Sequence, residues 1–366
     1  MKLLLIYPNK KNYSETFIRN HLQYLKPEHT LTGGWRAYID ENNKSIFTFP
    51  LSELIRIFIK RILPFWYAGF YTYFLTKHLK KIAPDCVLAE YGITGSVVLK
   101  ACQNLNIPLV VHFHGFDASE KRTLEKYAKA YKEVFDYAKA ICVVSRDMKQ
   151  ALANIGAPDA KLKLVPYGVD TTLFGAKEAY LDNKLVIAVG RFTHKKAPYL
   201  TIKAFKRVLE KETNARLMMV GVGELWEQAK KLVIELNLQE KVDFMGVQPP
   251  QEVAKLLQQA SIFVQHSMVN PLNGDSEGTP NSVLEATAVG LPVVSTFHGG
   301  IKDAVAHGET GFLVEEGDYE GMAAYIYELL ANAQTAEEMG RKGRIKMESE
   351  YSIEGQTAKL QKIINV

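Results

Sequence analysis

Cysteine is scarce in this sequence of 366 residues, and long hydrophobic runs are absent. The three cysteines, Cys86, Cys102 and Cys142, are an odd number without CxxC spacing, which favours reduced core residues of a cytosolic protein over a disulfide framework. No uninterrupted apolar stretch approaches the roughly 18 residues of a membrane-spanning helix. The apolar run before Pro8 is short, so we expect a first β-strand there rather than a signal peptide.

The sequence also has little excess of charge of one sign. The formal net charge is +5, and 23% of the residues are charged. This excess is too weak and too dispersed for a nucleic-acid-binding protein, but it is compatible with anionic ligands or an anionic membrane surface. A hydrophobic content of 47% is that of a soluble globular protein, and the chain is long enough for two domains of roughly 100–200 residues.

Strand-like and helix-like segments alternate along the chain, which predicts an α/β protein with doubly wound parallel sheets. In such sheets, the loops that follow the strands bind ligands at the carboxyl edge. The expected strands cover residues 2–7, 85–89, 108–113, 140–144, 184–189, 217–220, 242–245, 262–266 and 311–314, and the expected helices cover 15–25, 94–105, 146–155, 226–236 and 353–364.

The segment from Ser276 to Thr296 combines an expected anion site with a carboxylate pair. Thr279 is expected to cap a helix with Pro280 at its first position, and Gly290 suits the helix end. The free N–H groups of the first turn, together with Gly278, then form a site for a phosphate or diphosphate.

Glu277 lies in the loop, and Glu285 is expected about two turns into this helix. Carboxylates accept hydrogen bonds from hydroxyl groups and repel further anions, so a carboxylate pair beside a diphosphate site suits a sugar. A nucleotide-sugar is therefore the ligand that fits this segment.

The same segment resembles the glutamate-x7-glutamate signature of family 4 retaining glycosyltransferases (glycosyl transferases group 1) of the bacterial exopolysaccharide and lipopolysaccharide type. The matching positions are Glu277, Gly278, Thr279, Pro280, Leu284, Glu285, Ala286, Ala288, Gly290, Pro292, Val293 and Val294. An ordinary amphipathic helix would explain the apolar positions, but not Glu-Gly-Thr-Pro followed by a second Glu.

This resemblance implies the GT-B fold, in which two Rossmann-like doubly wound domains face each other across a cleft. We expect an acceptor-binding domain over residues 1–170, a donor-binding domain over 171–350, and a last helix over 351–366 that returns to the first domain. The element from Gly190 to Pro198 is similar to the family's Gly-Arg-Leu…Lys-Gly element.

Within that element, Gly190 lets the backbone approach a ligand, and Arg191 and Lys196 supply a planar fork and a point charge for one diphosphate. Ala197 stands where the family commonly has Gly. Lys195 is an alternative to Lys196, although the spacing favours Lys196. Both cations are also compatible with a solvated surface. Residues 297–301 are expected to form a flexible glycine loop.

In the first half, His114-Gly115-Phe116-Asp117 resembles the family's His-Gly-x-Asp/Glu element. The resemblance implies that His114 contacts the transferred hexose and that Asp117 lies on the acceptor side, although a histidine at a strand end is also commonly structural. His112 is expected to point to the other face of the sheet.

Three further acceptor-side candidates follow other expected strands. Ser14 and Glu15 open a Ser-Glu-Thr-Phe segment similar to that of exopolysaccharide-type members, although Ser14 is equally suited to cap a helix. Glu90 follows an expected strand.

The segment from 51 to 82 interleaves bulky aromatic residues with Lys and Arg. This mixture is typical of a peripheral contact with a membrane, here the inner face of the cell membrane. A buried aromatic face with a solvated cationic face is the alternative.

The resemblance implies transfer of a hexose from a nucleotide-sugar to a hydroxyl of a glycan or lipid-linked acceptor, with retention of anomeric configuration. It assigns catalysis to His114, Arg191, Lys196 and Glu277, and donor binding to Gly190, Arg191, Lys196, Glu277, Gly278, Thr279, Pro280, Asn281 and Glu285, with Glu285 on the ribose.

No Asp-x-Asp occurs, so a metal-bridged diphosphate is not indicated, and no cofactor besides the donor is expected. A nucleotide-sugar epimerase, a phosphorylase or a non-catalytic subunit of a polysaccharide assembly complex are the alternatives.

Overall fold

The computed structural model describes residues 1–8, 16–33, 38–47, 58, 61, 64–178, 181 and 183–365, with the side chains of 64–67 outside the description. The chain forms two compact units. The first comprises residues 1–144, 148–165 and 357–366, and the second comprises 145–147 and 166–356. The domain limits at residues 170 and 350 stay predictions.

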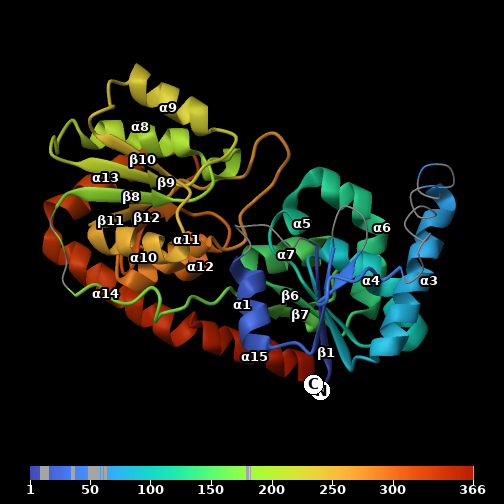
Figure 1. Cartoon of the computed structure of the whole chain (residues 1–366). Helices are drawn as coiled ribbons and strands as arrows, with labels where there is room; N and C mark the ends of the chain where they lie inside the picture. Colours follow the sequence, from blue (N-terminus) through green and yellow to red (C-terminus); the bar gives the residue numbers. More distant parts are fainter. Residues whose placement is uncertain are drawn as a thin grey trace. The chain divides into compact units, whose positions relative to one another are not determined.

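The first unit contains a sheet in the order β3-β2-β1-β4-β5-β6-β7. Its neighbouring strands are parallel, apart from the antiparallel pair of β2 and β3. Helices cover both faces, with α1 and α15 on one and α4 and α6 on the other (Figure 1). This double cover explains why β1, β4, β5 and β6 are buried along their whole length. The strands are β1 (Leu3–Tyr7), β2 (His29–Thr32), β3 (Ile39–Asp40), β4 (Cys86–Glu90), β5 (Leu109–His112), β6 (Ala140–Val143) and β7 (Leu162–Leu164).

The helices of this part of the chain are α1 (Thr16–Leu25), α3 (Pro64–Ile82), α4 (Gly92–Leu105), α5 (Phe116–Ser119), α6 (Lys121–Tyr137), α7 (Arg146–Asn154) and α15 (Ile353–Asn365), with a 3-10 turn, η1 (Asp159–Lys161). The three cysteines are free and buried. Among the helices that the structure describes, none has both the length and the apolar composition to cross a membrane.

The second unit contains six parallel strands in the order β10-β9-β8-β11-β12-β13. Figure 1 shows α8 and α9 on one side of this sheet and α10 and α11 on the other. The strands are β8 (Leu185–Val189), β9 (Arg216–Val220), β10 (Val242–Gly246), β11 (Ile262–Val264), β12 (Val293–Thr296) and β13 (Gly311–Val314). The helices are α8 (Pro198–Val208), α9 (Trp226–Glu235), α10 (Pro250–Gln259), α11 (Asn281–Val289), α12 (Ile301–Ala304), α13 (Tyr319–Ala331) and α14 (Ala333–Glu350), with a 3-10 turn, η2 (His194–Lys196).

Both sheets are doubly wound, which confirms the predicted fold class. The order of the strands reverses between β1 and β4 in the first sheet and between β8 and β11 in the second. Open α/β sheets bind ligands beyond the carboxyl ends of the strands at such a switch point. Glu90 ends β4, and Gly190 follows β8, so both lie at the places where the fold favours a site.

The expected helix cap at Thr279 is wrong. Helix α11 begins at Asn281, and its N-cap residue is Pro280, which has φ −65° and an extended ψ of 121°. Glu285 consequently lies just over one turn into the helix rather than two. The predicted end is confirmed, because Gly290 adopts the left-handed conformation with φ 90°.

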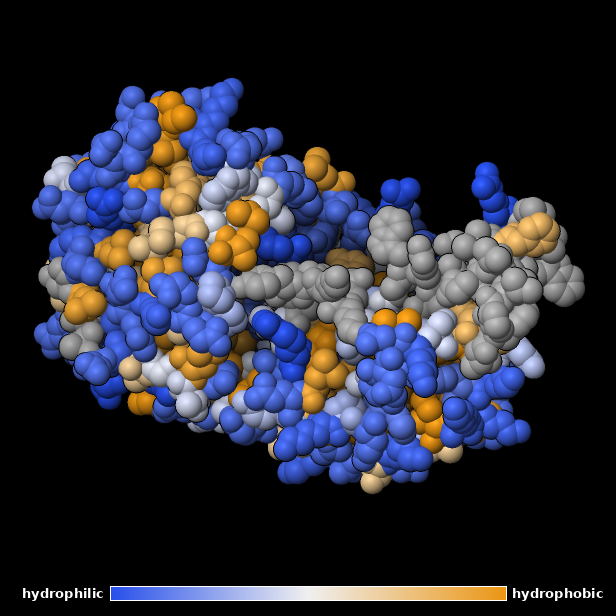
Figure 2. Space-filling view, viewed as in Figure 1, coloured by the Kyte–Doolittle hydropathy of each residue, from blue (hydrophilic) through white to orange (hydrophobic). Residues whose placement is uncertain are grey.

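The aromatic segment from 51 to 82 is only partly described, because residues 51–57, 59, 60, 62 and 63 lie outside the description. On α3, Phe70 and Phe74 pack on Phe47, with ring centroids 5.7 and 5.1 Å apart. Tyr73 is 63% exposed. On the face shown in Figure 2, hydrophobic residues lie between hydrophilic ones. Membrane contact through this segment stays a prediction.

Candidate active site

The carboxyl edge of the second sheet carries a group of polar side chains at its switch point. Gln265 directly follows β11, and its Oε1 accepts hydrogen bonds from Lys196 Nζ at 3.2 Å and from Ser282 Oγ at 2.9 Å. Ser282 lies in the first turn of α11. Gln265 therefore ties the lysine turn η2 to the N-terminus of α11, the helix end that favours anions.

The two lysines of η2 have different partners. Lys195 Nζ lies 2.9 Å from Asp275 Oδ2 and 3.7 Å from Glu277 Oε1. Lys196 Nζ lies 3.5 Å from Glu277 Oε2. Burial lowers the pKa of Lys195, but Glu277 and Asp275 outweigh burial and raise it. For Lys196, burial prevails and the pKa is lowered. The positive charge of Lys195 is thus compensated by carboxylates of the protein. Lys196 is held less closely by carboxylates, so its side chain remains able to bind an anion.

Ala197 ends η2 with φ 35°, in the left-handed region. A side chain in this region costs roughly 1–2 kcal/mol, which gives a physical reason for the Gly that the resembling family commonly has here.

Glu277 is an ionised carboxylate surrounded by cations. Burial raises its pKa, but the charges of Lys195 and Lys196 outweigh burial and lower the pKa from 4.5 to about 2. Among the described residues, Glu277 Oε1 and Asp275 Oδ1 are buried oxygens without a hydrogen-bond donor. Carboxylate oxygens accept several hydrogen bonds each, so Glu277 and Asp275 have unused capacity to accept hydrogen bonds.

Arg191 is the exposed cation of the group. Its guanidinium makes no hydrogen bond or ion pair with the described part of the chain. Together with Gly190, Lys196 and Gln265 it lines a small pocket over the end of β8. A planar donor fork beside this pocket is free for a bidentate bond to phosphate.

The backbone of the Glu277 loop is held by His298, which the sequence did not reveal as a site residue. Nε2 of His298 accepts a hydrogen bond from the N–H of Glu277 at 3.1 Å and lies 3.0 Å from Ser276 Oγ. Its Nδ1 lies 2.6 Å from Glu316 Oε1. These contacts give Glu277 a defined position.

The loop at 297–301 is packed into the protein, because His298, Gly299 and Gly300 are all buried, and its expected flexibility stays a prediction. Gly299 has φ 49°, and a Cβ there would lie 2.4 Å from the carbonyl oxygen of Glu277. Gly300 donates to the carbonyl oxygen of Gly278 at 2.6 Å. The glycines thus permit close packing against the Glu277-Gly278 backbone.

The other expected donor-binding residues lie around the same helix. Gly278, Thr279 and Pro280 are buried before α11, Asn281 begins the helix, and Glu285 is half-buried on it. The contact of Glu285 with a ribose stays a prediction.

In the first unit, the structure brings His114 and Glu90 together. His114 Nε2 lies 2.7 Å from Glu90 Oε2, and Glu90 is completely buried. The imidazole of His114 stacks on Phe17 with ring centroids 4.0 Å apart. Burial raises the pKa of Glu90, but the neighbouring His21 and His114 outweigh burial and lower it well below its usual value. The carboxylate thus fixes the orientation of the His114 ring.

Asp117 organises the loop that carries His114. Its Oδ1 accepts hydrogen bonds from the N–H groups of His114 and Gly115 at 3.0 and 2.9 Å, and its Oδ2 accepts one from Gly92 at 2.9 Å. It is completely buried. The contacts of Asp117 and Glu90 with an acceptor stay predictions, and Ser14 and Glu15 lie outside the described residues.

The expected orientation of His112 is wrong. Its ring lies beside that of His114, with centroids 4.5 Å apart, and its Nδ1 lies 4.0 Å from Glu90 Oε2. Residues two apart in a strand share a face, so the alternation places both histidines on the same side. Burial and the charge of His114 lower the pKa of His112 well below its usual value.

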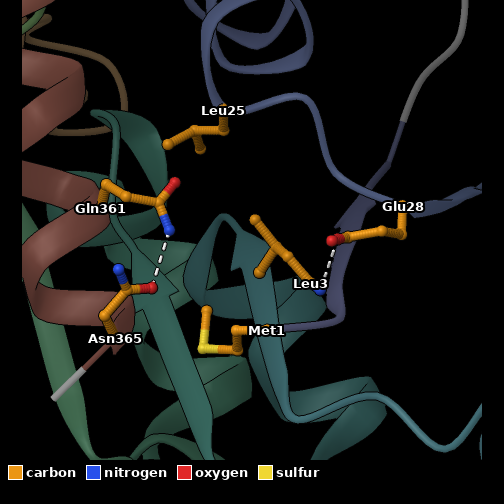
Figure 3. Close-up of a pocket in the computed structure, with 6 residues that line it drawn as sticks. All are labelled: Met1, Leu3, Leu25, Glu28, Gln361 and Asn365. Atoms are coloured by element: carbon orange, nitrogen blue, oxygen red, sulfur yellow. Dashed lines mark hydrogen bonds between the residues drawn. The ribbon is translucent and has the colours of Figure 1, made fainter.

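A larger cavity, of about 390 Å³, lies elsewhere in the first unit (Figure 3). Leu3, the first residue of β1, lines it, so it lies at the amino edge of the sheet, opposite the ligand-binding edge. Its lining is Met1, Leu3, Leu25, Glu28, Gln361 and Asn365. Glu28 is the one charged side chain among these described lining residues, so they offer no cationic side chain for a diphosphate.

The two doubly wound sheets and the cationic turn beside a Glu-Gly-Thr-Pro loop are features of glycosyltransferases with the GT-B fold. Residues 169–346 match the family described as glycosyl transferases group 1, and residues 29–173 match glycosyltransferase family 4. The chain belongs to this family of glycosyltransferases.

Two relatives illustrate its range. The chain is 30% identical over 277 residues to the amylovoran biosynthesis glycosyltransferase AmsK of Erwinia amylovora, covering 75% of this chain and 68% of that protein. It is 28% identical over 225 residues to the GDP-mannose-dependent phosphatidylinositol monomannoside mannosyltransferase of Mycolicibacterium smegmatis, covering 59% of each. The chain thus spans between 59% and 68% of the length of these relatives.

Solved structures share the fold across the whole chain. HepE of Anabaena in complex with UDP superposes with a TM-score of 0.77 at 17% identity and covers 100% of both chains. Sucrose-phosphate synthase of Thermosynechococcus elongatus gives a TM-score of 0.76 at 17% identity, with 100% of this chain and 98% of that chain covered. At this identity the likeness establishes the fold alone.

Proposed function

We propose that the protein transfers a hexose from a nucleotide-sugar to a hydroxyl of a glycan or lipid-linked acceptor, with retention of configuration, in the biosynthesis of a cell-surface polysaccharide. The observation that carries this proposal is the group of Arg191, Lys196 and ionised Glu277 at the switch point of the second sheet. The name of the Erwinia relative, a glycosyltransferase of amylovoran biosynthesis, supports the polysaccharide context.

In this reaction the bond between the anomeric carbon and the diphosphate oxygen breaks, and a bond to the acceptor oxygen forms on the same face of the sugar. Negative charge grows on the leaving diphosphate. Arg191, Lys196 and the N-terminus of α11 supply fixed positive potential there, the arrangement that stabilises a transition state most. The acceptor proton goes to the leaving diphosphate.

The remaining residues orient the sugar. Glu277 accepts hydrogen bonds from hexose hydroxyls, and Glu285 accepts those of the ribose. His114 contacts the hexose, with Glu90 and Asp117 as positioning residues for its ring and its loop. For the base, uracil and guanine are the first candidates, because HepE binds UDP and the mycolicibacterial relative uses GDP-mannose.

The test is a screen of UDP-, GDP- and ADP-sugars for binding and for release of the nucleoside diphosphate, without added metal. Release from one donor is expected, with loss in Lys196→Ala and Glu285→Ala but not in Lys206→Ala, an exposed lysine of α8. Absence of binding at millimolar donor would overturn the proposal. An isomerised donor sugar without transfer would identify an epimerase instead.

A further inference from the structure

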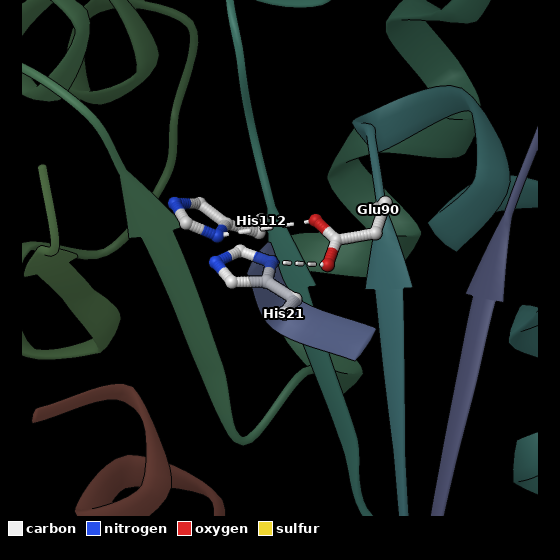
Figure 4. Close-up of side chains that lie close together, drawn as sticks. All are labelled: His21, Glu90 and His112. Atoms are coloured by element: carbon white, nitrogen blue, oxygen red, sulfur yellow. Dashed lines mark hydrogen bonds and ion pairs between the residues drawn. The ribbon is translucent and has the colours of Figure 1, made fainter. Parts of the chain in front are cut away.

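Three elements of the first unit bring two histidines and a glutamate together. His21 comes from α1, Glu90 ends β4, and His112 ends β5. One ligand atom from each lies within 4.8 Å of the other two. Figure 4 shows both imidazole rings beside the carboxylate of Glu90. All three residues are buried.

The ring nitrogens of His112 lack hydrogen bonds within this cluster. Neither of its ring nitrogens has a well-aligned hydrogen bond to a group that the structure describes, although both are shielded from water and the ring lies near the backbone of Val165. Buried polar atoms without partners are rare in folded proteins, and an ion is one of the explanations. His112 Nδ1 is 4.0 Å from Glu90 Oε2, which is too long for a hydrogen bond.

That separation is slightly longer than the distance between two ligand atoms of one ion. Zinc binds histidine nitrogen at about 2.0–2.1 Å and carboxylate oxygen at about 2.0–2.2 Å, so two of its ligand atoms in a tetrahedral site lie roughly 3.4 Å apart. His21 Nδ1 and Glu90 Oε1 lie 2.7 Å apart, so an ion requires these two atoms to separate and His112 Nδ1 to approach Glu90 by rotation of the side chains. The ion would replace the proton that these two atoms share.

We propose that His21, Glu90 and His112 bind a divalent transition-metal ion such as Zn²⁺. Two histidines and a glutamate are a known zinc ligand set with one coordination position left for water or another ligand. His114 donates to Glu90 through Nε2, as the outer partners of ligating carboxylates do. This ion is distinct from a metal that bridges a diphosphate, because none of its ligands belongs to the cationic turn or to the Glu277 loop.

The site is tested on the full chain with its purification tag removed, after chelator treatment. Zn²⁺ is titrated by calorimetry, and bound metal is counted by mass spectrometry after dialysis. We expect one ion per chain with micromolar or tighter affinity. His112→Gln and His21→Gln should weaken binding at least about tenfold, whereas the control His29→Gln, outside the cluster, should not.

A second measurement needs no variant. Co²⁺ added to the wild-type chain should give the visible absorption of a four-coordinate nitrogen and oxygen site, and Zn²⁺ should displace it. Two results would overturn the proposal: no saturable binding of either ion to the wild-type chain, or binding of unchanged affinity in folded His112→Gln and His21→Gln. Glycosyl transfer is not measured in either experiment, so the outcome is independent of the proposed function.

Discussion

Nε2 of His298 accepts a hydrogen bond from the backbone N–H of Glu277 at 3.1 Å. Since Nε2 is an acceptor, the proton of the neutral ring lies on Nδ1, which donates to Glu316 Oε1 at 2.6 Å. Burial raises the pKa of Glu316, but the hydrogen bonds from His298 and from the backbone of Val269, together with the neighbouring histidines, outweigh burial and lower it. The Glu316 carboxylate thus selects the tautomer that holds the Glu277 loop.

We therefore expect His298→Ala to leave the N–H of Glu277 without its acceptor and to lower the free energy of unfolding by about 1–3 kcal/mol. The donor KM should rise, because the carboxylate is no longer held. Glu316→Gln keeps an oxygen for Nδ1–H and should have a smaller effect than Glu316→Ala. Equal effects of the two Glu316 variants on KM would contradict this role.

Substitution by alanine should have different effects on stability at Gly190 and at Gly299. In Gly299→Ala, the Cβ would lie 2.4 Å from the carbonyl oxygen of Glu277 at a φ of 49°, so we expect destabilisation by roughly 2 kcal/mol or more. At Gly190 the nearest atom to a Cβ is 3.6 Å away, so Gly190→Ala should keep its melting temperature while binding the donor more weakly. Thermal denaturation and donor titration separate these effects, and a Gly190→Ala protein as unstable as Gly299→Ala would contradict the expectation.

The cysteines should be inert in the folded protein. Burial raises the pKa of Cys86 to about 11 and that of Cys102 to about 12, and it also raises the pKa of Cys142. The reactive thiolate is then almost absent at about pH 8. Iodoacetamide should modify none of the three thiols in the native state and all three in denaturant, as counted by mass spectrometry. Rapid native labelling of any one would contradict this.

The fold was predictable because its central strands are continuous apolar runs. The strands β2, β3 and β7 were missed, because all three are short and include half-buried or exposed residues, so none gives a hydrophobic run. The start of α11 was misplaced because Thr279 has a capping side chain and Pro280 suits a first turn. In the structure, Pro280 itself is the extended cap residue.

The charged residues of the candidate site could be predicted from their spacing and from the family resemblance. The residues that position them could not. Gln265, His298 and Glu316 act through contacts between segments that are separated in the sequence, and Lys196 and Gln265, for example, are 69 residues apart. Gln265 had a usable signal, since it follows a buried strand at the switch point. His21 had none, because its partner Glu90 is 69 residues away.

The pH dependence of stability should report on Glu277. Its pKa of about 2 in the folded protein lies below the usual 4.5, so the ionised carboxylate stabilises the fold fully above about pH 5, and this contribution is lost as the pH falls toward 2. The shift corresponds to at most about 3 kcal/mol. Glu277→Gln should show a shallower loss of stability over this range in urea denaturation, and parallel curves for the two proteins would contradict the lowered pKa.

Alanine variants of the two lysines should differ in their effects: Lys195→Ala should mainly reduce stability, and Lys196→Ala should mainly weaken donor binding. Lys195→Ala removes the cation 2.9 Å from the half-buried Asp275, and breaking a buried ion pair costs about 3–5 kcal/mol. Lys196 is held less closely, at 3.5 Å from Glu277, so Lys196→Ala should cost less stability but weaken binding of the nucleoside diphosphate by roughly tenfold or more. Calorimetric titration with UDP and GDP, beside thermal denaturation, distinguishes the two. If Lys195→Ala folded normally and lost the nucleotide while Lys196→Ala kept it, Lys195 would be the diphosphate ligand, and the spacing argument for Lys196 would be wrong.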